Sequence, residues 1–525
     1  MLHRNPIFIR FCRAELRLKK AGFWYLLVLI TTAFTVAIIY APQVVHGRDS
    51  MVAARAALLP VMIIQGIILL FMGTGNVASG ITREKVDNVL NYARLTPLPT
   101  RDKILGYLFG LPVRQYVLFA ITLPFLAFIL IVGRIPPGAF LPYYLILFSS
   151  TLLYHLTGMV AGMISRRWRW SARISQGLII LLYFVLPQLS HLGLVFLEFL
   201  TVRPVFAEKI LPVIGASSNI KMDEIGFMAG QSVPFFTMEI SGTLFSFVIQ
   251  AGLIVLLTAI VARKWKADTV PAFSKPLALA TFLVLIVMSL GNIWPNLTLS
   301  DNALRIFQAS GPTAGARLAV TALPLVLALT TTLLAFCLML PALPDPMQFR
   351  HGRIRAERLR RERLSLWEDA AGGYPFTSLL FLAQLILLAV VFFTLRLTGA
   401  FAAAGSQPLQ GTWLIAACGL SLFYFQGVKE GFGTGRVALF VLLGWALPIL
   451  AAILVIAIDQ NQGNTALLVA ALSPITLLPF AAVQLVPPEI LAEAPVQFHR
   501  PLAVGLLSLT TLTAWLHWRL DKRRR

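Results

Sequence analysis

Residues 56–79 read AALLPVMIIQGIILLFMGTGNVAS, and residues 80–103, which follow, read GITREKVDNVLNYARLTPLPTRDK. The first stretch is apolar and long enough to cross the hydrocarbon core of a bilayer, which takes roughly 20 residues in a helix. The second stretch is polar, and another apolar run begins near residue 115. The same alternation of long apolar runs and short basic segments continues along the chain. It predicts a helical protein that crosses a membrane many times.

The composition excludes a single water-soluble core. The chain has 525 residues, of which 58% are hydrophobic and 13% are charged, with a mean hydropathy of +0.80. Soluble domains carry about 25% charged residues. The net charge of +22 is explained better by the excess of Lys and Arg in the cytoplasmic loops of membrane proteins than by nucleic-acid binding. We therefore expect no nucleic-acid partner.

The basic residues set the expected orientation of residues 1–265. The basic segments before the first apolar run, between the second and third, between the fourth and fifth and after the sixth all lie inside if each run crosses once. The expected crossings are near 22–40, 56–79, 115–133, 140–164, 176–200 and 243–262. Residues 1–265 are thus predicted to form a six-span membrane domain with both ends inside.

Residues 266–525 contain further apolar runs, which include a broken one at 465–486. These runs lie near 276–295, 318–341, 375–397, 411–428, 436–458, 465–486 and 501–519. Residues 465–486 contain Ser473-Pro474 and Pro479. If this run enters the membrane and returns to the same side, more of the Lys and Arg residues of the chain lie on the cytoplasmic side. Irregular backbone at membrane depth is tolerated where protein buries it. The fold prediction is an all-α polytopic membrane protein with about 12 transmembrane helices in a six-plus-six arrangement, with 465–486 as a re-entrant segment.

Residues 1–21 have the pattern of an amphipathic helix on the inner membrane face. Basic residues at 3-4-3 spacing form one stripe, and apolar residues occupy the other side. The stripe is Arg10, Arg13, Arg17 and Lys20, and the apolar side is Phe8, Phe11, Cys12 and Leu16. Such a helix buries its apolar face at the headgroup boundary and attracts anionic lipid. The alternative is a basic anchor that only sets topology.

The segment 80–103 carries the signals of two short helices. Thr82 can cap the first helix, Glu84 suits its positive end, and the prolines of Thr-Pro-Leu-Pro end it. Its apolar stripe is Val86, Val89, Leu90 and Ala93, while Arg83, Asp87, Asn91 and Arg94 face away. Thr100 can cap a second helix. A loop that only sets topology needs charge but none of these signals, so we favour a docking element.

Several stretches of residues 1–130 resemble the ABC-2 type transporter permeases. They are Asn5-Pro6-Ile7-Phe8 with Arg10 and Arg13, Thr82-Arg83-Glu84-Lys85, Val89-Leu90, Leu95-Thr96-Pro97-Leu98 and Arg101-Asp102-Lys103-Ile104-Leu105-Gly106. The resemblance implies that residues 80–112 form a coupling region, which meets an ATP-hydrolysing subunit. The residues to which it assigns this contact are Arg83, Glu84, Lys85, Val89, Leu90, Thr96, Pro97 and Leu98.

The function implied is that of the permease subunit of an ATP-binding cassette exporter in the cytoplasmic (inner) membrane of a bacterium. It would move its substrate by alternating access. The chain has no G-x-x-x-x-G-K-S/T phosphate loop, so ATP and Mg²⁺ would be held by a separate ATPase dimer. Membrane lipids are the other expected partners, and pairing of two copies of the chain stays open.

The chain offers no pattern of catalytic or metal-ligating residues. Cys12, Cys337 and Cys418 are too few and too scattered for a metal site or a disulfide framework. No nucleophile elbow is present. We therefore predict neither an enzyme nor a metalloprotein.

The basic stretch 346–372 follows the second apolar run of the second half, as 80–103 follows that of the first. Glu357 and Arg361 are spaced for an i,i+4 ion pair. This stretch is either a second docking element or a solvated helix that is drawn to anionic lipid.

Polar residues inside apolar runs are candidates for a transport pathway. Those in the fourth and fifth expected crossings are His155, Gln188, His191 and Glu198. Hydrogen bonding between helices is the alternative role for each histidine.

Two other functions stay open. A secondary, ion-coupled transporter would more often carry a chain of acidic residues at mid-membrane depth. A membrane-embedded lipid-linked transferase usually needs acidic residues in its outer loops, and here they are scattered: Asp49, Asp223, Glu224 and Asp301.

Overall fold

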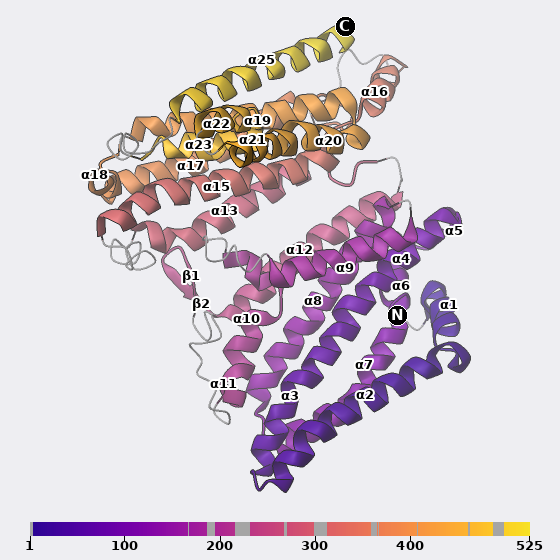
Figure 1. Cartoon of the computed structure of the whole chain (residues 1–525). Coiled ribbons are helices and arrows are strands. Elements are labelled where there is room, and N and C mark those ends of the chain that lie inside the picture. The colour runs from indigo at the N-terminus through magenta and orange to yellow at the C-terminus, as the bar shows by residue number, and fades with distance from the viewer. Residues whose placement is uncertain are drawn as a thin grey trace. The chain divides into compact units, whose positions relative to one another are not determined.

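The computed structural model forms two compact units (Figure 1). One unit contains Met1–Val233 and Met238–Val270, and the other contains Pro234–Thr237 and Pro271–Arg525. The structure describes residues 4–165, 167–185, 195–215, 232–266, 270–298, 312–358, 365, 367–406, 408–459, 462–486 and 498–524. Among these, the strands are β1 (Val233–Phe235) and β2 (Met238–Ile240), which pair in a hairpin.

The first unit is built from helices that pack around two apolar clusters. Its helices are α1 (Pro6–Glu15), α2 (Leu18–Val45), α3 (Ser50–Gly66), η2 (Ile67–Met72), α4 (Gly73–Val86), α5 (Val89–Leu95), α6 (Thr100–Gly110), α7 (Val113–Val132), α8 (Pro137–Ile164), α9 (Trp168–Phe184), η4 (Val195–Leu200), α10 (Arg203–Val205), η5 (Phe206–Ile210), α11 (Leu211–Gly215) and α12 (Gly242–Lys266).

The second unit packs its helices around one large apolar cluster. Its helices are α13 (Lys275–Thr298), α15 (Pro312–Ala342), α16 (Pro346–Arg358), α17 (Tyr374–Leu397), α18 (Ala400–Ala404), η8 (Pro408–Gln410), α19 (Gly411–Phe432), α20 (Thr434–Val441), η9 (Leu442–Ala446), α21 (Leu447–Ile458), α22 (Gly463–Ala470), α23 (Pro474–Val483) and α25 (His499–Arg524).

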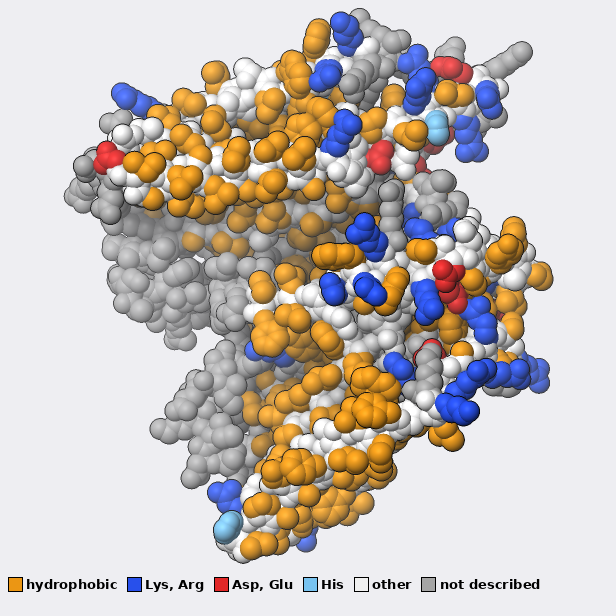
Figure 2. Space-filling model, turned by 45° about the vertical axis from the view of Figure 1, so that its right-hand side comes forward, with side chains coloured by type: hydrophobic (Ala, Val, Ile, Leu, Met, Phe, Trp, Pro, Cys, Tyr) orange, Lys and Arg blue, Asp and Glu red, His pale blue; other side chains and the backbone are white. Residues whose placement is uncertain are grey.

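Within the described ranges, 10 helical stretches are long and apolar enough to cross a membrane. Their outward faces carry Leu, Ile, Val and Phe, as the broad hydrophobic faces of both units in Figure 2 show. A water-soluble protein would bury such side chains, whereas lipid solvates them. The prediction of an all-α, multi-pass membrane protein is confirmed at this level.

Two of the predicted crossings fall outside this set. For the crossing near 176–200, the described helix α9 begins earlier, at Trp168, and ends at Phe184 after 17 residues. For the crossing near 501–519, α25 is long enough at 26 residues, but its polar positions make it less apolar than the others. About 12 crossings were predicted, and 10 are observed among the described residues. These two segments account for the difference.

The second crossing is a continuous helical stretch, Ser50–Val86, with a π-helical segment η2 in its middle. It extends past residue 79 because nothing in the chain breaks the helix before Asp87. The predicted helix start at Thr82 is therefore wrong. Thr82 lies inside α4, where its Oγ1 donates to the carbonyl oxygen of Ala78 at 2.9 Å and is 3.0 Å from that of Gly162 in α8.

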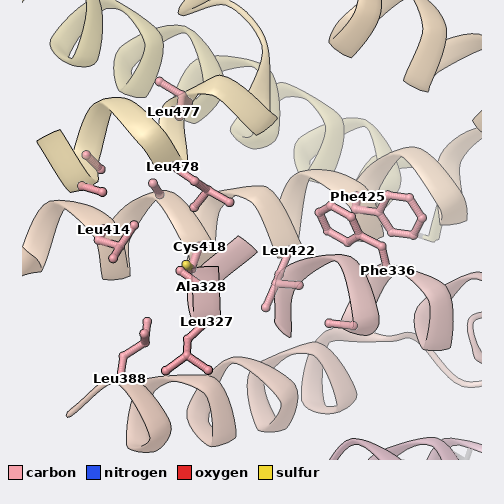
Figure 3. Close-up of a cluster of buried hydrophobic side chains, with 14 of the residues drawn as sticks. Leu327, Ala328, Phe336, Leu388, Leu414, Cys418, Leu422, Phe425, Leu477 and Leu478 are labelled. Carbon is pink, nitrogen blue, oxygen red and sulfur yellow. The ribbon is translucent and has the colours of Figure 1, made fainter. Parts of the chain in front are cut away.

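The segment 465–486 forms two short helices, α22 and α23, which meet at Ser473. Figure 3 shows Leu478 of α23 on the side of Leu414 and Cys418 of α19, whereas Leu477 points away from α19, and all four are buried. Protein therefore covers the broken backbone of this segment, which is the condition under which such a break is tolerated at membrane depth.

Asp345 connects the end of α15 to the start of α20. Its Oδ1 accepts hydrogen bonds from the backbone N–H of Thr434 at 2.7 Å and from Nζ of buried Lys429 at 2.5 Å. Partial burial alone would raise the pKa of Asp345, but the hydrogen bonds from Lys429 and Thr434 bring this pKa below its ordinary value of 3.8. The ionised carboxylate is therefore part of the native fold.

We expect Asp345→Asn to lower the Tm of the detergent-solubilised protein, because it leaves Lys429 buried without this counter-charge, at a cost of about 3 kcal/mol. Folding lowers the pKa of Asp345, so its stabilisation is present above about pH 4 and is lost as the pH falls below that value. Melting curves of both proteins between neutral and acid pH check this. The difference in Tm should shrink toward zero at the acid end, and a difference that stays constant would contradict the assignment.

Candidate functional site

The polar segment 80–103 lies at one end of the first unit, where α1, α4, α5 and α6 meet (Figure 1). Helix α4 ends at Val86, and Asn88 turns the chain with a positive φ of 60°. Helix α5 then runs to Leu95, and α6 begins at Thr100. The predicted pair of helices around Thr-Pro-Leu-Pro is present. The first of the two starts later than predicted, and the cap of the second is Pro99 and not Thr100.

The inner face of α5 is anchored by Leu90, which is 1% exposed. Leu90 belongs to an apolar cluster with Tyr107 of α6, Met163 of α8 and Trp265 of α12. The rings of Tyr107 and Trp265 lie 5.2 Å apart. The cluster thus connects α5 to the ends of three other helices.

Polar contacts hold the C-terminal end of α5. The buried side chain of Lys103 donates from Nζ to the carbonyl oxygens of Arg94 at 3.0 Å and Thr96 at 2.9 Å. The guanidinium of Arg94 donates to the carbonyl oxygen of Lys264 in α12 at 3.2 Å. The last carbonyl oxygens of a helix have no intrahelical partners. The carbonyls of Arg94 and Thr96 lie at the end of α5, and that of Lys264 lies near the end of α12. Lys103 therefore fixes the Thr-Pro-Leu-Pro turn, although the sequence did not single it out.

Lys103→Met should loosen this turn, because it removes the ammonium group while keeping an unbranched apolar stem of similar size. Each lost hydrogen bond to the ammonium is worth about 1.5–3 kcal/mol, so hydrogen exchange in residues 91–100 should accelerate by about tenfold or more. Arg101→Met is the matched control, since Arg101 is on the same helix and largely exposed. Equal exchange in wild type and Lys103→Met would show that the turn does not depend on this contact.

Glu84 is engaged by side chains of this chain. Its side chain is 15% exposed and forms an ion pair with Arg10 of α1, while Tyr107 donates its hydroxyl to the other carboxylate oxygen. Burial, followed by the nearby Glu84 charge, raises the pKa of Tyr107, so Tyr107 stays a neutral donor. Lys85, which was also predicted to contact the ATPase, donates to the carbonyl oxygen of Met163 at 2.5 Å.

Helix α1 packs on α6. Asn5 caps α1 by accepting from the backbone N–H of Ile7 at 3.0 Å, and its Nδ2 donates to the carbonyl oxygen of Asp102 at 2.6 Å. Phe11 is buried in a T-shaped contact with Tyr107, their ring centroids 5.5 Å apart. A Cβ at Gly110 would lie 2.7 Å from the Phe11 ring, so this approach needs glycine.

The predicted single basic stripe of residues 1–21 is divided between two helices. Helix α1 ends at Glu15, Arg17 precedes α2, and Lys20 lies within α2. Arg10 and Arg13 remain on α1, and Arg10 faces Glu84. The break follows from Leu16, which leaves the helical conformation. The apolar side chain Phe11 packs against protein, where the sequence predicted contact with lipid.

The exposed surface of this region includes two large apolar side chains that the predicted contact set lacks. Tyr92 is 72% and Leu95 is 82% exposed, and they are three residues apart on one side of α5. Thr96 and Pro97 follow Leu95 in the chain and are also exposed. We call these four residues the docking surface, after the role that we propose for them. Sequence reasoning missed Tyr92 and Leu95, although both are apolar residues that lie off the stripe of Val86, Val89, Leu90 and Ala93.

The other predicted contact residues take different places. Arg83 is exposed, as predicted, and forms a 3.9 Å ion pair with Asp87. Val89 and Leu98 are half-buried, and Leu90 belongs to the apolar cluster. The structure therefore separates the predicted set into outward residues and residues that hold the segment in place.

The pathway candidates are not brought together among the described residues. His155 is buried, with Nε2 3.1 Å from the carbonyl oxygen of Leu69 in η2 and Nδ1 3.1 Å from the hydroxyl of Tyr116. This geometry is that of a hydrogen bond between helices. Glu198 lies in η4. Gln188 and His191 lie outside the described residues.

A buried polar contact that the sequence did not single out is centred on Gln65 of α3. Its Oε1 accepts from the Tyr144 hydroxyl at 2.5 Å, and its Nε2 donates to Thr122 at 2.9 Å. Gln65 thereby links α3, α7 and α8 inside the first unit. In the sequence, the signal for this contact was a single glutamine, Gln65, within a long apolar run.

The basic stretch 346–372 forms a helix, α16, only over Pro346–Arg358 in its described part. The predicted partner of Glu357, Arg361, lies outside the described residues. Among the described residues, Glu357 accepts a hydrogen bond from Nε of Arg353 at 3.2 Å, one turn earlier on the same helix.

Comparison of the chain with protein-family models, with curated proteins and with solved structures finds no match.

Proposed function

We propose that this chain is the permease subunit of an ABC-2 type exporter, and that a separate ATPase dimer binds the docking surface. The observation that carries the proposal is the pair of exposed apolar side chains Tyr92 and Leu95 on a short helix that is fixed to the ends of other helices. Tyr is among the residues that most often anchor protein interfaces, and a neighbouring Leu adds apolar area that binding can bury. A loop that only sets topology has no need of such anchors.

The contacts of α5 suit the transmission of force. A displacement of α5 acts on α6 through Lys103, on α12 through Arg94 and on α8 through Leu90. The ion pair of Arg10 with Glu84 adds α1 and α4. Closure of the ATPase dimer on ATP would thus move several membrane helices together. The energy would come from the different affinities of the two transporter states for ATP and substrate.

We further propose the six-plus-six topology, with residues 1–265 and 266–525 as its two domains and α9 and α25 as part of its crossings. In this topology 465–486 is re-entrant, which its break at Ser473 supports. The basic residues at the ends of α12 and α25 would lie inside, in the cytoplasmic membrane of a bacterium. ATP and Mg²⁺ would be bound by the ATPase chains.

The test is purification of the full chain from its own host in mild detergent. We expect an ATP-hydrolysing protein to copurify, and we expect transport by the intact cells to stop when ATP is depleted. Recovery of the permease alone, together with transport that ignores ATP depletion, would contradict the proposal. Such a result would favour the ion-coupled transporter.

A further inference from the structure

The start of helix α9 carries an exposed group of arginine and tryptophan side chains that the proposed function does not use. Helix α9 packs on α4 and α8 of the first unit (Figure 1). Ser171 donates its hydroxyl to the carbonyl oxygen of Ala78 in α4 at 2.9 Å, which fixes the side of α9 that faces inward. The buried residues of that side are Ser171, Ser175, Ile179 and Leu182.

Two arginines at the start of α9 lie over tryptophan rings. The guanidinium carbon of Arg169 is 5.1 Å from the ring centroid of Trp168, and that of Arg173 is 5.8 Å from the ring centroid of Trp170. The two tryptophans are 47% and 54% exposed, and Arg167, which precedes the helix, is exposed as well. A cation–π contact uses no N–H donor. The guanidinium donors therefore stay available to a ligand, and their geometry suits phosphate.

The positive charge of this group is not neutralised by nearby carboxylates. Residues 103–197 contain no Asp or Glu. Within the part of the chain that the structure describes, neither Arg169 nor Arg173 forms an ion pair. On neighbouring α4, Glu84 and Asp87 are paired with arginines of α1 and α4. The start of α9 therefore favours an anionic partner.

The same outward side of α9 continues from the arginines into apolar surface. Trp170, Arg173 and Ile174 follow one another at steps of three and four residues, which places them on one side of a helix. Further along that side are exposed Ile180, Leu181 and Phe184. Gly177 lies among them, and a Cβ at this position would meet no atom within 4 Å. The helix backbone is thus accessible to an acyl chain here.

This order of side chains matches the layers of a lipid leaflet. Trp and Arg are typical of the headgroup layer, and exposed aliphatic side chains are typical of the hydrocarbon. From Ile174 to Phe184 the helix rises about 15 Å, or about half of the roughly 30 Å hydrocarbon core. One leaflet of lipid therefore fits the apolar part, with its headgroups at the arginines.

We propose that the outward side of α9 binds an anionic phospholipid. The lipid phosphate lies against Arg169 and Arg173, and an acyl chain lies along Ile174, Gly177 and Leu181. Basic residues at the membrane surface attract anionic headgroups, and the apolar side chains add contact that a soluble anion cannot use. The assignment does not depend on the ATPase, so either proposal can fail without the other.

The test is photo-crosslinking of the full chain in mild detergent with phosphatidylglycerol that carries a diazirine in its headgroup. Peptide mapping should find the label in residues 167–184. Unlabelled phosphatidylglycerol should compete at a concentration about tenfold lower than phosphatidylcholine with the same acyl chains. The variant R169Q/R173Q should reduce labelling of this segment about tenfold. The matched control R83Q/R101Q removes two largely exposed arginines from the same unit and should leave the labelling unchanged.

Four results would overturn the proposal. The first is absence of label from residues 167–184 of the wild type, which would show that protein covers this side of α9. The second is equal competition by the two lipids. The third is an equal loss of labelling in both double variants, which would indicate a general effect of charge. The fourth is displacement of the probe by millimolar inorganic phosphate, which would assign the arginines to a soluble anion. The Tm of each variant is measured alongside, and R169Q alone serves if the double variant does not fold.

Discussion

Replacement of Tyr92 and Leu95 by glutamate is expected to abolish copurification of the ATPase and ATP-dependent transport. Both side chains are exposed, at 72% and 82%, so their replacement should not disturb the fold. A Tyr anchor contributes about 2 kcal/mol to an interface, and burial of Leu95 would add about 2 kcal/mol. The loss of both weakens binding by roughly a thousandfold. Pull-down of the ATPase with the tagged permease and a transport assay in cells measure the effect.

The matched control for this variant is Met238→Glu. Met238 is an apolar side chain on β2 that is 59% exposed, and in the proposed topology it lies on the outer side. It should leave both readouts unchanged. If Tyr92→Glu/Leu95→Glu keeps the ATPase bound, the docking surface is wrong. Membrane insertion and Tm of the variant, which should equal those of the wild type, separate lost binding from lost folding.

Glu84→Arg is expected to destabilise the first unit and to uncouple ATP hydrolysis from transport. The new guanidinium would face Arg10 and would remove the acceptor of the Tyr107 hydroxyl. We expect a cost of about 2–3 kcal/mol, or roughly 5 °C in Tm. Because Glu84 is not part of the docking surface, the ATPase should still copurify. Tm, copurification and transport are measured on the same preparations.

Two further variants make this result specific. Arg10→Glu/Glu84→Arg restores opposite charges and should recover most of the Tm. Arg83→Glu repels Asp87 in the same helical turn, but that ion pair is largely exposed at 78% and 58%, so it should change stability by about 0.5 kcal/mol or less. If Glu84→Arg removes the ATPase without a change in Tm, Glu84 acts as a direct contact and its inward role is wrong.

The membrane helices could be predicted because lipid offers no hydrogen-bond partners to the backbone of a long apolar run. Polar backbone groups must pair within the helix, so long apolar runs such as Val113–Val132 become helices whatever surrounds them. Helix ends are less predictable, because tertiary contacts decide them. Helix α4 continues to Val86, beyond the apolar run that ends at residue 79. Within this extension, Thr82 donates its hydroxyl to the carbonyl oxygen of Gly162 in α8.

By itself, the sequence determined the membrane class of the protein and the break between α5 and α6. Both depend on local chemistry: apolar runs select lipid, and proline cannot continue the helix. Only the tertiary structure decided which side chains of residues 80–103 face outward. Glu84 turns inward because Arg10, 74 residues earlier, reaches it. Tyr92 and Leu95 face outward because Leu90 occupies the apolar cluster with Tyr107 and Trp265.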